Sequence, residues 1–349
     1  MAHGKRGDML VHEDEPYNAE PPPDALAGQP LTTVDAFYSR NHGAIPNLDP
    51  AAWRLRVDGL VGRQLELTLE ELRQRFEQHT VVATLQCAGN RRNGFLPFGD
   101  IPGEAAWGST ATSTAEWTGV RLRDVLLAAE PCPEAAHIEF SGPDVALDAK
   151  PPQEFGSSIP VQKATSSEVL LAWAMNREPL PAAHGAPVRV VVPGYIGARS
   201  VKWVQRIRAL GFPSENYFQA VAYRLDSAAL GAVPLTSDIL RPVDAYLLPP
   251  GPTTVYGYAF AGHGRGITRV EVSIDRGRSW LPAKVDEDLG QWAWQLWQAT
   301  VFLPPGPGEI LARAWDGSTT QPESARSLWN PKGYVNNSWP RAQVSVSSA

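Results

Sequence analysis

One cysteine with two arginines close behind it is the part of the sequence best suited to chemistry. Cys87 lies in the stretch TLQCAGNRR, after an apolar, β-branched run and before an Ala-Gly-Asn turn, and Arg91 and Arg92 follow it. Neighbouring cations lower the pKa of a thiol and favour the thiolate, which binds soft metals or attacks electrophiles. The alternative is a buried, inert cysteine with its arginines in surface ion pairs. We therefore treat Cys87 as a candidate metal ligand or nucleophile at the end of a strand.

A second group of polar residues lies upstream and ends at a glycine. Hydrogen-bond donors crowded beside a glycine suit the capture of a phosphate or another anion, although a solvated loop would have a similar composition. The members of this group are Tyr38, Ser39, Arg40, Asn41 and His42.

A third group brackets the apolar run Val188–Val192. His184 and Arg189 lie at its start, and Ser200 and Lys202 follow it. Because a buried charge needs a partner, cations at both ends of a buried strand suggest a polyanionic ligand. Taken together, the three groups predict an anionic cofactor with a soft metal bound to Cys87.

These groups are set among mixed helices and strands in the first two-thirds of the chain. A Thr-x-x-Glu capping box at Thr68 and Glu71 predicts a short helix through Leu72 and Phe76. Two further helices are expected at Leu122–Ala129 and Ser167–Asn176. Hydrophobic alternation and apolar runs predict strands at Trp53–Asp58, Val81–Leu85, His137–Phe140 and Val188–Val192.

The composition shifts near Pro234, and short strands separated by turns replace helices. The expected strands are Val255–Phe260, Ile267–Ile274, Trp292–Trp297, Ile310–Trp315 and Gln343–Val346. Strands at this spacing are typical of an immunoglobulin-like sandwich. We therefore expect an α+β protein with an extended N-terminal arm at 1–30, a cofactor-binding domain at 31–232 and an all-β domain at 233–349.

Composition and charge exclude several classes of protein. With 349 residues, 43% hydrophobic and 19% charged, the chain is neither disordered nor a coiled coil. A net charge of -6 argues against nucleic acid as a partner. No run of about 18 apolar residues predicts a membrane span. Without a leader segment we expect the cytoplasm, or the periplasm if a precursor segment was removed. Cys87 and Cys132 are too few for a disulfide framework.

The three groups also carry a family resemblance. The stretches SRNHG, TLQCAGNRR, HGAPVRVVVPGYIGARSVKW and WAWQLWQA closely resemble the sulfite oxidase family of mononuclear molybdenum enzymes, nearest to the haem-free plant type. The resemblance extends from Pro16 to Trp339. It implies a molybdopterin-binding α+β domain followed by an immunoglobulin-like domain that forms a homodimer.

The resemblance also implies roles for individual residues. Cys87 corresponds to the protein thiolate on molybdenum. The phosphate of the cofactor would be held by Arg189 and Lys202, and Asp144 would accept from donors of the pterin, although an ordinary turn aspartate is the commoner reading. The full set implied for the cofactor is Tyr38, Ser39, Arg40, Asn41, His42, Cys87, Asp144, His184, Arg189, Ser200, Val201 and Lys202.

The substrate pocket implied by the resemblance contains Arg40, Arg92, Trp107, Tyr223 and Lys332. Trp107 and Tyr223 also fit ordinary core positions. Lys332 stands where the family has an arginine. A lysine keeps the positive charge but loses the planar fork that binds an oxyanion at two points, so affinity and substrate choice are affected before the chemistry is.

The activity implied is oxidation of sulfite to sulfate by oxygen-atom transfer at the Cys-ligated molybdenum-molybdopterin centre. We expect no haem in this chain, so electrons would pass to an external acceptor, cytochrome c or dioxygen. Reduction of nitrate or a sulfoxide on the same cofactor is the alternative; Tyr223 and the positive Lys332 favour sulfite. A non-catalytic binding protein is a more distant possibility.

Overall fold

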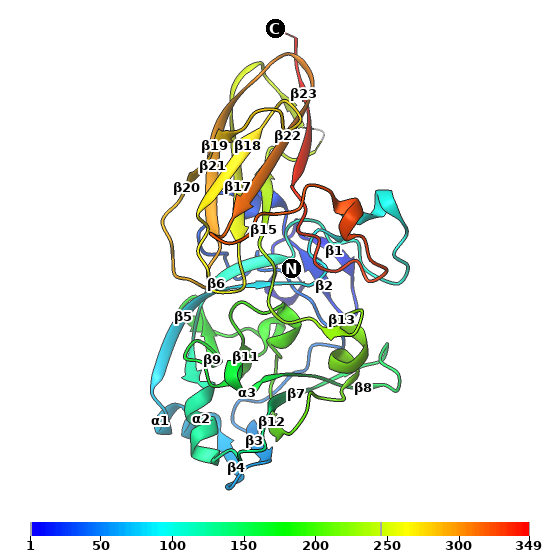
Figure 1. Cartoon of the computed structure of the whole chain (residues 1–349). Coiled ribbons are helices and arrows are strands. Elements are labelled where there is room, and N and C mark those ends of the chain that lie inside the picture. The colour runs from blue at the N-terminus through cyan, green and yellow to red at the C-terminus, as the bar shows by residue number, and fades with distance from the viewer. Residues whose placement is uncertain (1, 245, 349) are drawn as a thin grey trace.

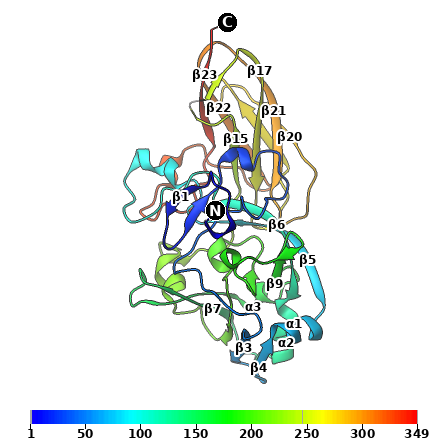
Figure 2. The same ribbon diagram turned by 180° about the vertical axis from the view of Figure 1, so that it is seen from behind.

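The protein consists of a mixed α/β part and an all-β part stacked along one long axis (Figure 1). The computed structural model describes residues 2–244 and 246–348. The C-terminus lies at the far tip of the all-β part, whereas the N-terminal segment lies at the level where the two parts meet. The view from behind shows the same arrangement (Figure 2). This agrees with the expected α+β fold followed by a β-rich domain.

The first part is built on two five-stranded sheets. In the first sheet the order is β10-β9-β6-β5, and β11 pairs with β9. In the second the order is β4-β3-β12-β7-β8, with β12 parallel to β3. The strands of the first sheet are β5 (Gln78–Gln86), β6 (Thr112–Arg121), β9 (Leu170–Met175), β10 (Glu178–Pro179) and β11 (Arg189–Val191). Those of the second are β3 (Arg54–Gly59), β4 (Leu65–Thr68), β7 (His137–Ala146), β8 (Gln153–Pro160) and β12 (Arg206–Leu210).

The helices of this part are short. Helix α1 (Leu69–Arg75) begins with the predicted capping box, in which the Glu71 amide donates to the Thr68 hydroxyl at 3.0 Å and the Thr68 amide donates to the Glu71 carboxylate at 2.8 Å. Helix α2 (Leu122–Ala129) is also as predicted. A third helix, α3, spans Val161–Ala164.

The helix expected at Ser167–Asn176 is wrong. Strand β9 occupies Leu170–Met175 and pairs with both β6 and β11, so it is interior to its sheet and its residues are largely buried. A short apolar run that is buried on both faces has no alternation to distinguish it from a buried helix. This segment forms a strand because it pairs with β6 and with β11 through backbone hydrogen bonds.

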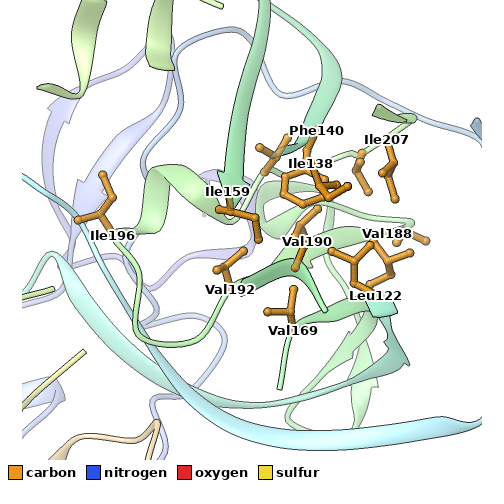
Figure 3. Close-up of a cluster of buried hydrophobic side chains, with 14 of the residues drawn as sticks. Leu122, Ile138, Phe140, Ile159, Val169, Val188, Val190, Val192, Ile196 and Ile207 are labelled. Atoms are coloured by element: carbon orange, nitrogen blue, oxygen red, sulfur yellow. The ribbon is translucent and has the colours of Figure 1, made fainter. Parts of the chain in front are cut away.

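Strand β11 divides the interior of the first part. Val188, Val190 and Val192 face a core shared with Ile138, Phe140 and Ile207 of the second sheet (Figure 3). The alternate residue Val191 belongs to a separate cluster that includes Cys87. The strand is thus buried on both faces, as predicted from its continuous apolar sequence.

The second part is a sandwich of a four-stranded and a five-stranded sheet. Its core contains Val255, Val272, Trp297 and Ile310 from both sheets. The first sheet has the order β15 (Thr236–Arg241), β17 (Gly251–Phe260), β21 (Gln295–Leu303), β20 (Lys284–Val285). The second has the order β16 (Tyr246–Leu248), β23 (Arg341–Val346), β22 (Gly306–Trp315), β18 (Arg269–Ser273), β19 (Leu281–Pro282).

The N-terminal arm is folded rather than extended. It contains the hairpin of β1 (Leu10–Glu13) and β2 (Asn18–Glu20), and Ala19 of β2 exchanges backbone hydrogen bonds with Ser39 at 2.8 and 2.9 Å. The buried Glu20 carboxylate accepts from the amides of Gly108 at 2.6 Å and Thr110 at 3.1 Å. The arm is therefore an integral part of the first domain.

A minimal hairpin of β13 (Arg224–Leu225) and β14 (Ala228–Ala229) precedes the sandwich.

Among the helices of the described residues, none is long and apolar enough to span a membrane.

Candidate active site

The three polar groups of the sequence converge on one cavity that is partly open to solvent. The cavity lies where the end of β5 meets the loop before β3 and the segment that surrounds β11. Most of the predicted residues line it: Tyr38, Ser39, Arg40, Asn41, His42, Cys87, Asp144, His184, Arg189, Ser200, Lys202 and Tyr223. Residues 185 positions apart in the sequence, Tyr38 and Tyr223, thus face the same space.

Cys87 is held at the end of β5 by its backbone. Its amide donates to the Ala111 carbonyl at 2.9 Å, and its sulfur accepts from the Gly89 amide at 3.4 Å. Burial raises the pKa of the Cys87 thiol above its ordinary value, and the positive charges of Arg92 and Arg40 only partly oppose this effect. The arginines lower the pKa of the thiol as expected, but burial outweighs them, so the expected net shift toward the thiolate is not found. A bound metal cation would supply the charge that deprotonates the thiol.

The side chains of the two adjacent arginines that follow Cys87 point in different directions. Arg92 turns back toward the cysteine and is almost fully buried. Its guanidinium forms an ion pair with Glu104 at 3.1 Å and donates to the carbonyls of Ala105 at 2.8 Å and Gly333 at 3.3 Å. A Cβ on Gly89 would lie 2.7 Å from the guanidinium carbon of Arg92, so a larger residue in this turn would displace the Arg92 guanidinium.

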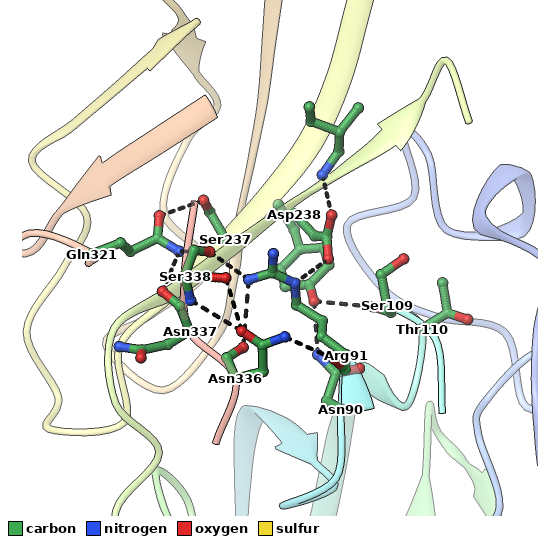
Figure 4. A network of polar contacts seen from close by, with 12 residues as sticks. Asn90, Arg91, Ser109, Thr110, Ser237, Asp238, Gln321, Asn336, Asn337 and Ser338 are labelled. Atoms are coloured by element: carbon green, nitrogen blue, oxygen red, sulfur yellow. Dashed lines mark hydrogen bonds and ion pairs between the residues drawn. The ribbon is translucent and has the colours of Figure 1, made fainter. Parts of the chain in front are cut away.

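Arg91 points away from the cavity and into the second domain. Its Nε lies 2.7 Å from the Asp238 carboxylate on β15, and its Nη1 donates to the Ser338 carbonyl at 2.6 Å (Figure 4). The Asn336 amide in turn donates to the Arg91 carbonyl at 2.9 Å. Arg91 therefore ties the cysteine loop to the sandwich and does not act on the thiol.

Three cations surround the cavity without carboxylate partners: Arg189 is buried, and Arg40 and Lys202 are half-buried. Among the described residues, none of Arg40, Arg189 and Lys202 has an acidic oxygen within 4 Å. Arg189 donates to the carbonyls of His184 and Ser200, both at 3.0 Å, and Lys202 donates to the Arg40 carbonyl at 3.1 Å. Burial lowers the pKa of Arg189 to about 10 and the pKa of Lys202 well below its ordinary value. Such charges favour an anionic ligand that neutralises them.

Asp144 is the acidic side chain of the cavity lining. It lies on β7, 5% exposed, and its Oδ1 is buried without a hydrogen-bond partner among the described atoms. Burial raises the pKa of Asp144 to about 7, with the Lys202 charge opposing. An unsatisfied buried oxygen costs free energy unless a ligand donates to it. The cavity therefore offers cations for an anion together with an acceptor for ligand N–H groups.

His42 joins the upstream loop to Tyr223. Its Nε2 lies 2.7 Å from the Tyr223 hydroxyl, and its ring stacks on Phe155 with centroids 5.1 Å apart. Burial, together with the charge of Arg40, lowers the pKa of His42 to about 3, so the ring is neutral. A neutral imidazole can donate through one nitrogen and accept through the other.

A glycine makes room for the floor of the cavity. A Cβ on Gly197 would lie 2.6 Å from the hydroxyl oxygen of Tyr38, so any other residue would collide with the tyrosine. Burial holds the pKa of Tyr38 well above its usual range, which keeps the hydroxyl protonated as a hydrogen-bond donor.

Four predicted residues do not line the cavity. Val201 is buried, and its carbonyl accepts from the Val190 amide at 2.8 Å, so its place in the cofactor set stays a prediction. Trp107 is fully buried against His12, with ring centroids 4.5 Å apart. Arg92 and the half-buried Lys332 do not line the cavity. They lie near each other, because Arg92 donates to the carbonyl of Gly333, the residue that follows Lys332. As substrate contacts, Arg92, Trp107 and Lys332 remain predictions.

Sequence reasoning missed several residues of the site. Asn18 on the arm accepts from the Asn41 amide at 2.6 Å, and Lys5 contacts His184. Phe155 and Gly197 line the cavity. Asn18 lies in the stretch PYNAEPP that begins at Pro16, where the family resemblance starts, so this stretch offered a usable signal. Nothing in the composition of the first ten residues marks Lys5.

Comparison with known proteins agrees with this geometry. Residues 42–218 match the family described as the oxidoreductase molybdopterin binding domain, and residues 227–347 match the Mo-co oxidoreductase dimerisation domain. The chain is 42% identical to sulfite oxidase of Gallus gallus, over 95% of this chain and 77% of the relative. It is 36% identical to sulfite oxidase of Arabidopsis thaliana, over 95% and 93%.

A solved structure shares the architecture as well. The sulfane dehydrogenase SoxCD from Paracoccus pantotrophus superposes with a TM-score of 0.84 at 28% identity, over 99% of this chain and 89% of that one. The identity is higher with the animal enzyme, whereas the extent of the chain corresponds better to the plant enzyme.

Proposed function

The chain belongs to the sulfite oxidase family of molybdopterin-dependent oxidoreductases, and from this membership we propose that it oxidises sulfite to sulfate. The observation that carries the proposal is a set of buried and half-buried cations without carboxylate partners around a buried thiol. Arg40, Arg189 and Lys202 supply the charge, and Cys87 supplies the sulfur. This combination fits an anionic cofactor that carries a soft metal.

The lining residues fit molybdopterin group by group. Cys87 would bind the molybdenum, and Arg189 and Lys202 would bind the phosphate through charge-assisted hydrogen bonds. The unpartnered Oδ1 of Asp144 would accept from an N–H group of the pterin. When bound, the molybdenum centre supplies two-electron redox chemistry with oxygen-atom transfer.

The protein's own contribution is to attract and orient a dianion. Sulfite approaches a protein of net charge -6, so a local positive field is required. Arg40 lies in the cavity wall, and Arg92 and Lys332 lie behind it. The Tyr223 hydroxyl, held protonated by burial and bonded to His42, is placed to donate a hydrogen bond to an oxyanion. Preorganised donors of this kind stabilise developing charge without rearrangement.

Assembly, location and electron acceptor extend the proposal. The second domain belongs to the Mo-co dimerisation family, and we propose a homodimer. Reducing equivalents would leave to an external acceptor, cytochrome c or dioxygen, and the enzyme would work in the cytoplasm.

Steady-state assays on the molybdenum-loaded protein test the function. We expect turnover with sulfite and little with nitrate or dimethyl sulfoxide, and we expect either cytochrome c reduction or peroxide formation. Cys87→Ser should lower the rate by more than about a hundredfold, because loss of a metal ligand exceeds the cost of an outer-shell change. Turnover of nitrate alone, or wild-type activity in Cys87→Ser, would contradict the proposal.

A further inference from the structure

A lysine from the N-terminal arm is buried against the back of the cofactor cavity. Lys5 is 2% exposed, and its Nζ donates to the carbonyls of Val34 at 2.7 Å and Phe37 at 2.8 Å. The third neighbour of this nitrogen is Nε2 of His184, which lines the cavity. An ammonium has three N–H donors, and the structure places one acceptor for each of them.

The charge of Lys5 is not balanced by a neighbouring acid. No carboxylate oxygen of the described residues lies within 4 Å of Nζ. Burial lowers the pKa of Lys5 to about 7, and the more distant Asp35 opposes this only in part. A neighbouring bound anion would offset the cost of this buried charge, as for the cations that line the cavity.

The contact with Lys5 determines which nitrogen of His184 carries the proton. Burial, followed by the charge of Lys5, holds the pKa of His184 well below its usual range, so the ring is neutral. If Nε2 accepts from the ammonium, the single ring proton must be on Nδ1. Among the described residues, the one side-chain hydrogen bond of this ring is made through Nε2. The Val34 carbonyl is also within hydrogen-bond reach of the ring. The Nδ1–H group has no side-chain partner among the described residues and can donate to a ligand.

We propose that Lys5 is a positioning residue of the cofactor cavity: it holds His184 as the tautomer protonated at Nδ1, so that the ring donates to an acceptor atom of the bound molybdopterin. The inference rests on the cofactor proposed above and extends the site to the arm. The packing of Phe37 edge-on against His184, at 5.2 Å between centroids, fixes the ring plane.

The adjacent cation provides a matched control. Arg6 is partly exposed and pairs with Asp8, so Arg6→Met removes a positive charge one residue away without touching the cavity. Lys5→Met keeps the length of the side chain and removes the donor and the charge. Lys5→Arg restores both.

The first measurement is the nitrogen-15 NMR spectrum of the histidine rings in cofactor-free protein, with His184 assigned by the signal lost in His184→Gln. We expect the pattern of a neutral ring protonated at Nδ1 in wild type, Arg6→Met and Lys5→Arg, and loss of that preference in Lys5→Met. A ring protonated at Nε2 in wild type, or an unchanged pattern in Lys5→Met, would overturn the proposal.

The second measurement is cofactor retention, followed as molybdenum and pterin remaining per chain after dilution. Lys5→Met should release the cofactor at least tenfold faster than wild type and Arg6→Met. Equal retention in Lys5→Met, even with a lowered melting temperature, would reduce Lys5 to a packing residue and overturn the inference. If wild type itself holds no molybdopterin, the proposed function fails, and the NMR result still decides the tautomer. Should Lys5→Met not fold, Lys5→Gln, which keeps a donor without the charge, replaces it in both measurements.

Discussion

The cations on either side of the cysteine loop, Arg91 at the domain junction and Arg189 with Lys202 in the cavity, are neutralised in different ways. At the domain junction, Arg91 has a complete set of partners from the chain itself, with Asp238 at 2.7 Å and carbonyls of the 336–338 segment. In the cavity, Arg189 and Lys202 have carbonyl partners and no carboxylate within 4 Å in the described part of the molecule. The junction is complete within one chain, whereas the cavity is completed by a ligand.

This difference separates residues that stabilise the fold from residues that prepare a site. A paired buried charge is costly to break, because removing one partner leaves the other uncompensated. An unpaired buried charge already destabilises the cofactor-free protein, so removing it costs little until the ligand binds. Substitutions at the two places should therefore differ in which state of the protein they affect.

The largest expected effect is at the junction. Arg91→Met leaves the Asp238 carboxylate buried without its partner, and we expect the free energy of unfolding of the cofactor-free protein to fall by about 3–5 kcal/mol. Urea denaturation measures this. The control is Arg63→Met, which removes an exposed pair with Glu130 and should cost less than about 1 kcal/mol. Equal losses in the two variants would show that the junction is not a stabilising element.

The next effect is expected in the cavity and only when the cofactor is present. Lys202→Met removes a charge-assisted contact to an anion, worth about 1.5–3 kcal/mol, and cofactor affinity should fall by tenfold or more. Without cofactor, the same variant should unfold within about 1 kcal/mol of wild type, because a desolvated charge is removed along with its hydrogen bonds. A large loss of apo stability with unchanged molybdenum content would reverse this assignment.

The cavity and the junction should also differ in how their titratable groups make stability depend on pH. His42 has its pKa lowered to about 3 in the fold from an ordinary 6.5, so between these values the unfolded chain binds the proton and the folded chain does not. Its contribution to stability is lost as pH falls through this window. Asp238 has its pKa raised to about 6 by burial, with Arg91 opposing, from an ordinary 3.8. Its contribution has the opposite sign and is lost as pH rises through about 6.

Urea denaturation of cofactor-free protein at pH 6.5, 5.5 and 4.5 measures both contributions, each at most about 1.4 kcal/mol per pH unit. His42→Gln should weaken the loss of stability on acidification, and Asp238→Asn should steepen it. A change in the same direction for both variants would contradict the assigned shifts.

The smallest effect is expected at Lys332, outside the cavity lining. Lys332→Arg restores a planar fork without changing the charge. We expect the KM for sulfite to fall severalfold with kcat unchanged, which corresponds to a gain in binding free energy of less than about 1 kcal/mol. Steady-state kinetics of the loaded enzyme measure this. A change in kcat instead would place this side chain in the chemical step.

The sequence predicted the composition of the cavity better than the orientation of its members. Cys87 and the donors at 38–42 and 184–202 could be found because their residue types were unusual for their surroundings. The division of labour between Arg91 and Arg92 could not, since the left-handed backbone at Arg91, φ 65°, sends adjacent side chains to different domains. Trp107 was equally undecided, because a large aromatic serves a core or a pocket and only packing distinguishes the two.

The fold shows the same limit. Alternating strands and the capping box were readable, because local spacing encodes them. Strand β9 was not, because its identity depends on β6 and β11, which are distant in sequence. The arm was expected to be extended, yet its hairpin and the buried Lys5, Asn18 and Glu20 are fixed by partners far along the chain.

The placement of the two chain ends has a practical consequence for anyone who handles this protein. Near the front of the chain, Lys5 contacts His184 of the cavity lining, whereas the last strand, β23, runs toward the tip of the sandwich (Figure 1). An affinity handle or electrode tether fused at the front would be attached within a few residues of the buried Lys5. We expect the same fusion at the rear to interfere less with metal loading, because the tip of the sandwich lies far from the first domain (Figure 1).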